Sequence, residues 1–147
     1  MSATALDQGP VADQHQRPLR VLRLSLTARC NLACPYCLPD GQEAPGLLNQ
    51  AQQLAVLRAA CRLGVQSLRL TGGEPLLCPG LEPLLTAISA ERQQPGSPLA
   101  QLQDIALTSN GSLLTAERAR ALRQAGLQRI TISLDGSDGA KIGRAHV

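Results

Sequence analysis

The feature of this sequence that most constrains its fold is the repeated alternation of short aliphatic runs with helix-like segments. Residues 19–27 (LRVLRLSLT), 65–71 (VQSLRLT), 104–111 (DIALTSNG) and 128–136 (QRITISLDG) read as strands. Helical signals follow each of the first three. Strands that alternate with helices in this way are typical of βαβ units. We therefore expect an α/β fold with a parallel sheet or barrel.

Start and stop signals place the helices between these strands. Asn49 is a typical N-cap residue and Gly64 a typical stop, so the first helix is expected between them. The second helix is expected over about residues 79–92, before the turn-forming stretch QQPGSP. The third is expected from its cap, Thr115, to Gly126. About four βα units can therefore be read along the chain.

Length and composition fit one globular domain, or part of one. The chain has 147 residues, of which 44% are hydrophobic and 17% charged, and this balance argues against global disorder. Phe and Trp are absent and there is one Tyr, so leucine must supply most of the core. We expect a flexible arm over residues 1–17, a core over 18–136 and a tail without a helical period over 137–147. No apolar run approaches the roughly 20 residues that span a bilayer, which excludes a transmembrane protein.

The charge pattern gives little support for binding to nucleic acid. Lys and Arg (14) against Asp and Glu (11) give a formal net charge of +3. The basic residues are spread along the chain, without interleaved aromatics. The N-terminus has no basic region followed by an apolar one, so it is not a secretory signal. A cytoplasmic, reducing location is therefore expected, and there clustered cysteines bind metals more often than they form disulfides.

Each expected strand has one aliphatic face and one polar face. In the first strand, leucines alternate with Arg23 and Ser25, and the other strands repeat the pattern. Parallel strands that are buried on both sides are usually aliphatic throughout, so the polar faces indicate a sheet curved around a polar ligand. That ligand is expected at the C-terminal ends of the strands, which carry Thr27, Thr71, Thr108 and Ser133. The alternative is that the polar faces are simply half exposed to water.

The loop after the first strand holds three closely spaced cysteines, Cys30, Cys34 and Cys37, in the sequence ARCNLACPYC. Thiolates at this spacing suit a soft metal or an iron–sulfur cluster. A structural zinc site and a conventional cluster both have four protein ligands, so three thiolates leave one metal position open for an external ligand. The alternatives are a zinc site completed by His15 or Cys78 and a spacing that arose by chance.

A second motif, TGGEP, follows the second strand. Gly72 and Gly73 let the backbone approach a ligand closely and expose amide and carbonyl groups. Glu74 adds a carboxylate, so the loop is suited to hold the ammonium group of a zwitterion. Taken alone, the motif is also compatible with an ordinary Gly-Gly turn.

The two motifs together, in this order and each after a strand, resemble those of the radical S-adenosylmethionine superfamily. CNLACPYC has the family's cysteine spacing, and GGEP is its second hallmark motif. The resemblance implies that Cys30, Cys34 and Cys37 bind three irons of a [4Fe-4S] cluster, and that S-adenosylmethionine chelates the fourth. It also implies a partial TIM-like barrel in which reductive cleavage of S-adenosylmethionine gives a 5′-deoxyadenosyl radical.

Within this superfamily the chain is most similar to the GTP 3′,8-cyclases of molybdenum-cofactor biosynthesis. The segments LRLSLTARCNLACPYCLPDG, LGVQSLRLTGGEPLL, LTSNGSLL and AGLQRITISLDG are similar to that family's signatures, in the same order. The resemblance, with the second motif, implies that S-adenosylmethionine is bound by Tyr36, Gly72, Gly73, Glu74 and Ser133. It implies that GTP is bound by Arg23, Arg69 and Thr108.

The strand alternation places the same two arginines, Arg23 and Arg69, on the polar face. An arginine that faces a barrel interior is costly unless it is paired. Guanidinium groups suit phosphate oxygens, so binding of a nucleotide would offset that cost. The alternative is that both are exposed strand arginines at a rim.

The sequence departs from the family's pattern in composition and in length. Ala28 stands where the family commonly has aspartate, and Leu38 where it commonly has methionine. The family's barrel has about six βα units, and the cyclases have three further cysteines for a second cluster. After Ser133 this sequence shows neither the further βα units nor the three further cysteines. We therefore expect a C-terminally truncated chain that is inactive by itself.

The resemblance also implies partners. GTP is the expected substrate, a reductant such as flavodoxin or ferredoxin is the expected electron donor, and the full-length protein is expected as a homodimer. Neither nucleic acid nor a membrane is an expected partner. Two alternatives stay open: another radical S-adenosylmethionine enzyme, such as a peptide-modifying maturase, and a catalytically silent iron–sulfur or zinc-binding module.

Overall fold

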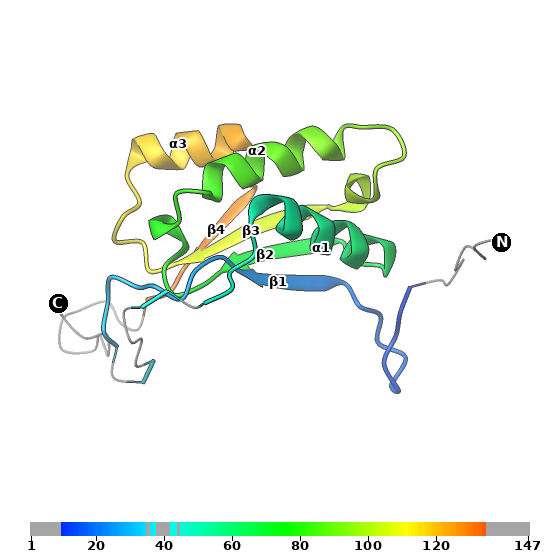
Figure 1. Ribbon diagram of the computed structural model, residues 1–147, viewed down its shortest axis with the longest axis horizontal. Coiled ribbons are helices and arrows are strands. Elements are labelled where there is room, and N and C mark those ends of the chain that lie inside the picture. Colours follow the sequence, from blue (N-terminus) through cyan, green and yellow to red (C-terminus); the bar gives the residue numbers. More distant parts are fainter. Residues whose placement is uncertain (1–9, 35, 38–41, 44, 135–147) are drawn as a thin grey trace.

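The computed structural model describes residues 10–34, 36–37, 42–43 and 45–134 of the chain. Its elements follow the order β1 (Val21–Ser25), α1 (Gln50–Arg62), β2 (Ser67–Thr71), η1 (Pro75–Leu77), α2 (Leu81–Arg92), η2 (Pro98–Gln101), β3 (Asp104–Ser109), α3 (Ala116–Ala125) and β4 (Arg129–Ile132). The strands are parallel, in the order β1-β2-β3-β4. The three α-helices lie on one face of this sheet (Figure 1). The expected α/β class is thereby confirmed, and the arrangement is that of part of a TIM-like barrel.

Local sequence signals determine where the helices begin and end. The Asn49 side chain accepts a hydrogen bond from the backbone N–H of Gln52, whose side chain accepts one in return from the Asn49 N–H. Thr115 caps α3, and Gly126 ends it with a φ of 112°, which glycine adopts without strain. The caps expected for α1 and α3 are therefore confirmed. None of the described helices is long and apolar enough to cross a membrane.

Several elements begin later than expected. α2 starts at Leu81 because Pro79 and Gly80 form a turn before it. β1 starts two residues late because the backbone N–H of Leu19 donates to the carbonyl oxygen of Val11, outside the sheet. The stretch after α2 contains the 3-10 helix η2, which the sequence pattern did not indicate.

The aliphatic faces of the strands pack against the helices and form a core made mostly of leucine. In the sheet, Leu68, Leu70 and Leu107 are fully buried. The helices contribute Leu57, Leu81, Leu84, Leu85, Ile88 and Leu122, which are also fully buried. This core stabilises the sheet from one side only.

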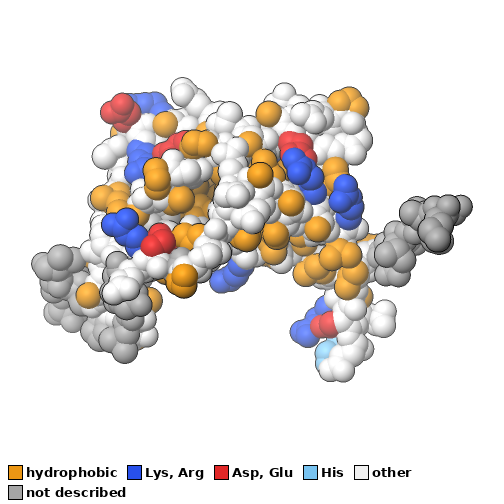
Figure 2. Space-filling view, viewed as in Figure 1, with side chains coloured by type: hydrophobic (Ala, Val, Ile, Leu, Met, Phe, Trp, Pro, Cys, Tyr) orange, Lys and Arg blue, Asp and Glu red, His pale blue; other side chains and the backbone are white. Residues whose placement is uncertain are grey.

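Ion pairs join the helices on the outer side of the molecule, where charges of both signs are mixed (Figure 2). Arg58 on α1 pairs with Glu91 on α2, and Arg118 on α3 pairs with Glu82 on α2. Because these side chains are partly exposed, we expect each pair to contribute at most about 1 kcal/mol. The helix layer therefore depends mainly on the leucine core.

The opposite face of the sheet is polar, and no helix within the described part of the chain covers it. The register places Arg23, Arg69, Ala106 and Arg129 side by side in one row across the four strands. Arg23 is exposed and Arg69 is half-buried. The described elements thus leave this face open, and they do not by themselves form the enclosed interior expected for it.

Residues 11–18 form a turn at the end of the sheet opposite the cysteine loop (Figure 1). The backbone N–H of Val11 donates to the carbonyl oxygen of Leu63 at 3.1 Å, which fastens the turn to the end of α1. Nothing in the sequence pattern indicated this turn within the expected N-terminal arm. Residues 1–9 and the tail expected over 137–147 lie outside the described residues.

Burial separates Cys61 from the three cysteines of the loop. Cys61 lies in α1 with 1% of its surface exposed, and burial raises the pKa of its thiol. Alkylation requires an accessible thiolate. We therefore expect iodoacetamide to modify Cys61 at least about 100-fold more slowly than the exposed Cys37, because Cys61 reacts only after local opening. Peptide mass spectrometry measures both rates, and similar rates would contradict the described core.

Candidate functional site

The site is built where the loop after β1 meets the turn after β2. The backbone N–H of Gly73 donates to the carbonyl oxygen of Thr27 at 2.8 Å, and that of Glu74 donates to Arg29 at 2.8 Å. These bonds continue the pairing of β1 with β2 beyond the end of the sheet. They fasten the start of the cysteine loop to the TGGEP turn.

The two glycines of the turn are required by this close approach. A Cβ atom on Gly72 would lie 2.6 Å from the carbonyl oxygen of Thr27. A Cβ atom on Gly73 would overlap the carbonyl group of Arg29. The backbone of the turn can therefore reach the cysteine loop only when both positions lack side chains.

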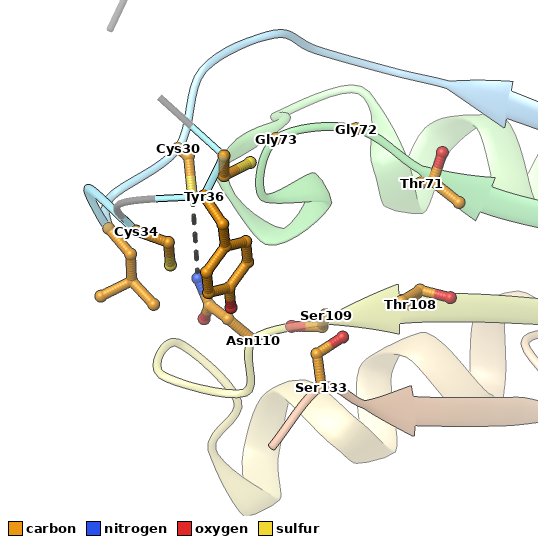
Figure 3. A pocket seen from close by; sticks show the side chains of 12 residues that line it. Cys30, Cys34, Tyr36, Thr71, Gly72, Gly73, Thr108, Ser109, Asn110 and Ser133 are labelled. Carbon is orange, nitrogen blue, oxygen red and sulfur yellow. Dashed lines mark hydrogen bonds between the residues drawn. The ribbon is translucent and has the colours of Figure 1, made fainter. Parts of the chain in front are cut away.

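A pocket of about 310 Å³ opens at the C-terminal ends of the strands (Figure 3). Eight of the expected site residues line it: Cys30, Cys34, Tyr36, Cys37, Gly72, Gly73, Thr108 and Ser133. Four residues complete the lining: Leu32, Thr71, Ser109 and Asn110. The structure thus brings together residues from the loops after all four strands.

The three cysteines of the loop are available as ligands. Cys30 and Cys34 are half-buried, Cys37 is exposed, and all three are free thiols. Cluster thiolates bind different iron atoms, so they surround a volume rather than converge on one point. Three soft sulfur donors around one pocket fit that requirement.

The zinc alternative receives no support from the described residues. A zinc ion needs four ligands that converge on one point. Among the described residues, no group of three or more His, Cys, Asp or Glu side chains could hold a single metal ion. His15 belongs to the turn formed by residues 11–18. That turn lies at the other end of the sheet (Figure 1).

The structure places Glu74 beneath the pocket rather than in its lining. Its side chain is fully buried. Oε1 accepts hydrogen bonds from the backbone N–H of Leu76 at 3.0 Å and from the hydroxyl of Ser109 at 2.8 Å, and Oε2 accepts one from the backbone N–H of Asn110 at 2.8 Å. The carboxylate therefore joins the turn after β2 to the turn after β3.

Arg23 and Arg69 also lie outside the pocket lining. They are register partners on β1 and β2, and they occupy the polar face two residues before Ser25 and Thr71. Neither guanidinium forms an ion pair with a described residue. The two positive charges therefore lie side by side next to the pocket.

Sequence reasoning assigned no role to Glu43, Asn31 or Asn110. The Glu43 carboxylate accepts hydrogen bonds from the Thr27 hydroxyl and, at 2.7 Å, from the backbone N–H of Ala28, so it closes the base of the cysteine loop. The amide of Asn110 donates to Asn31 at 2.9 Å. Two signals pointed to Asn110: its position after a strand, at the edge that carries the two motifs, and its place in the segment LTSNGSLL.

The contact between Gly73 and Arg29 can be tested by substitution. Gly73→Ala is expected to lower the free energy of unfolding by about 1–3 kcal/mol, because the methyl group displaces the cysteine loop. Gly80→Ala is the control, since its Cβ would meet only the sulfur of Cys78, at 3.9 Å. We expect it to change the stability by less than about 0.5 kcal/mol. Urea unfolding measures both changes in stability, and equal effects would contradict the described close contact between the Gly-Gly turn and the cysteine loop.

Curated proteins named GTP 3′,8-cyclase are similar in sequence to this chain. GTP 3′,8-cyclase of Parasynechococcus marenigrum (strain WH8102) is 66% identical over 134 residues, which cover 91% of this chain and 39% of that protein. GTP 3′,8-cyclase of Xanthomonas campestris pv. campestris (strain B100) is 43% identical over 142 residues, covering 92% of this chain and 39% of that protein. The chain thus spans about two fifths of the length of these curated relatives.

Solved structures share the fold at low sequence identity. BtrN in complex with AdoMet and 2-DOIA matches with a TM-score of 0.61 and 20% identity over 76% of this chain and 44% of that chain. TsrM of Kitasatospora setae, a radical S-adenosylmethionine methyltransferase with cobalamin and a [4Fe-4S] cluster bound, matches with a TM-score of 0.62 and 21% identity over 84% of this chain and 23% of that chain. The model of the Radical SAM superfamily matches residues 24–146. The chain therefore belongs to the radical S-adenosylmethionine superfamily.

Proposed function

We propose that this chain is the part of a GTP 3′,8-cyclase of molybdenum-cofactor biosynthesis that binds the [4Fe-4S] cluster and S-adenosylmethionine. The observation that carries the proposal is the pocket in which three cysteines and the Gly-Gly turn lie together. The high identity to cyclases of this name supports the subfamily.

In this proposal Cys30, Cys34 and Cys37 bind the cluster through three of its irons. When bound, the cluster supplies the electron for cleavage of S-adenosylmethionine to methionine and a 5′-deoxyadenosyl radical, which removes a hydrogen atom from the substrate. The chain supplies the position of these groups and the exclusion of competing reactions. The three thiolates leave one iron free for the amino and carboxylate groups of S-adenosylmethionine.

The remaining pocket residues hold S-adenosylmethionine. The turn formed by Gly72 and Gly73 presents backbone amide and carbonyl groups to the methionine end. The ring of Tyr36 and the hydroxyl of Ser133 line the pocket from opposite sides (Figure 3). Because Glu74 is buried and accepts three hydrogen bonds below the pocket, its contribution to cofactor binding is to hold this turn in place.

GTP is the substrate in this proposal, and it lies along the polar face. Thr108 lines the pocket, and Arg23 and Arg69 lie on the same face nearer the middle of the sheet. A strand rises about 3.3 Å per residue, so guanidinium groups two residues away can reach toward the pocket edge. Phosphate oxygens match the guanidinium geometry and compensate the two adjacent charges.

The proposal includes a protein reductant of the flavodoxin or ferredoxin type, because the cluster needs an electron for each cleavage. It also includes a cytoplasmic location, where such reductants and unpaired thiols coexist. The chain spans 39% of the length of the cyclase that it matches at 66% identity. Suitable tests therefore measure the binding of the cluster and of GTP rather than turnover.

Anaerobic reconstitution tests the cluster. The chain is expected to take up about four irons, and the electron paramagnetic resonance spectrum of the reduced cluster is expected to change when S-adenosylmethionine is added. Cys34→Ser should abolish four-iron uptake, whereas Cys78→Ser, outside the pocket lining, should leave it intact. Uptake of zinc without iron would instead favour a metal-binding module without this chemistry.

Equilibrium dialysis with GTP tests the substrate. Arg69→Gln is expected to raise the dissociation constant for GTP by at least about tenfold, because a charge-assisted hydrogen bond contributes about 1.5–3 kcal/mol. Arg62→Gln, at an exposed position in the last turn of α1, is the matched control and should leave binding unchanged. Equal affinities of the two variants would contradict the role of Arg69. No binding of GTP by the reconstituted chain would count against a cyclase and favour another radical S-adenosylmethionine enzyme.

A further inference from the structure

The side-chain amide of Asn110 lies between the turn after β3 and the cysteine loop. Its Oδ1 accepts hydrogen bonds from the backbone N–H of Ser112 at 2.9 Å and from the Ser112 hydroxyl at 2.7 Å. Its Nδ2 donates to Oδ1 of Asn31 at 2.9 Å and lies 4.0 Å from Sγ of Cys30, at the outer limit for a hydrogen bond to sulfur (Figure 3). The amide thus connects the two loops.

The hydrogen bonds determine which way this amide points. The backbone N–H of Ser112 can only donate, so the atom of Asn110 that faces it must be the carbonyl oxygen. Rotating the amide by half a turn would place two donors against each other. The N–H groups of Asn110 therefore face Asn31 and the sulfur of Cys30.

Glu74 holds the backbone from which this amide extends. Its buried carboxylate accepts the N–H of Asn110 at 2.8 Å and the hydroxyl of Ser109 at 2.8 Å. The same hydroxyl accepts the N–H of Gly111 at 3.0 Å. The turn after β3 is therefore tied on both sides of Asn110 to a carboxylate that carries no surface exposure.

We propose that Asn110 donates a hydrogen bond to the Cys30 thiolate of the bound cluster and raises the reduction potential of the cluster, with Glu74 as the positioning residue that acts through Asn110. The proposal rests on the cluster ligation of the proposed function. Hydrogen bonds to cluster sulfurs are one of the factors that set the potential. Reduction adds negative charge to the cluster and its sulfurs, so a donor at Cys30 stabilises the reduced state more than the oxidised one.

A redox titration of the reconstituted cluster, followed by electron paramagnetic resonance without S-adenosylmethionine, tests this role. Asn110→Ala is expected to lower the equilibrium constant for reduction by about three- to tenfold, which at 59 mV per tenfold is about 30–60 mV. Asn49→Ala is the matched control. The Asn49 side chain also accepts a hydrogen bond from a backbone N–H, but it lies at the start of α1. Its removal should leave the reduction potential unchanged.

Two further variants separate tuning from a structural role. Asn110→Asp keeps the shape and the acceptor for Ser112 but replaces the donor, so the potential should fall at least as far as in Asn110→Ala. Glu74→Gln places an amide N–H opposite the N–H of Asn110, so it should shift the potential in the same direction.

Each outcome is decisive. If the wild-type chain assembles a four-iron cluster and both Asn110 variants keep its potential, the role of Asn110 is wrong and the proposed function stands. If neither Asn110 variant assembles a cluster while Asn49→Ala does, Asn110 serves assembly, and the tuning role is overturned. If the wild-type chain itself takes up no four-iron cluster, the proposed function fails first, and the role of Asn110 falls with it.

Discussion

The interlock between the Gly72–Gly73 turn and the backbone of residues 27–29 is the constraint on which the site depends. Two backbone hydrogen bonds of 2.8 Å join the segments, and they form only because neither glycine carries a Cβ atom. The interlock brings the cysteine loop and the turn after β2 to the same pocket.

The buried carboxylate of Glu74 extends the junction to the third strand. A buried charge is costly unless it is hydrogen-bonded, and here both carboxylate oxygens accept bonds from the turns after β2 and β3. Removing one partner would leave the buried charge with fewer hydrogen bonds, so the three loops are coupled. This coupling explains how a site assembled from loops can hold a fixed geometry.

The two faces of the sheet have different roles. Leucine on one face packs against the helices and provides stability, while arginine, serine and threonine on the other face remain available for ligands. Arg23 and Arg69 belong to the second set, since the pairing of β1 with β2 places their charges next to each other and no described partner neutralises them. Substitutions on the two faces should therefore affect different properties of the chain.

Sequence patterns predicted what depends on neighbours along the chain. The helix ends at Asn49 and Gly126 are local signals, and the structure confirms the helices that they predict. The cysteine spacing and the Gly-Gly turn are local signals as well, and both motifs line one pocket. The position of Glu74 under the pocket, and the amide of Asn110 beside Cys30, depend on contacts between residues 35 and 80 positions apart. No periodicity or spacing encodes such contacts, so they could be recognised only from the fold.

The central claim is that three thiolates leave one iron of a cluster free for S-adenosylmethionine. Mössbauer spectroscopy of the chain reconstituted with iron-57 tests this claim most directly, because it distinguishes irons by their ligands. The account predicts that one iron of four changes its isomer shift when S-adenosylmethionine is added, while the others keep theirs. Four irons with the same ligation, unaltered by S-adenosylmethionine, would contradict it.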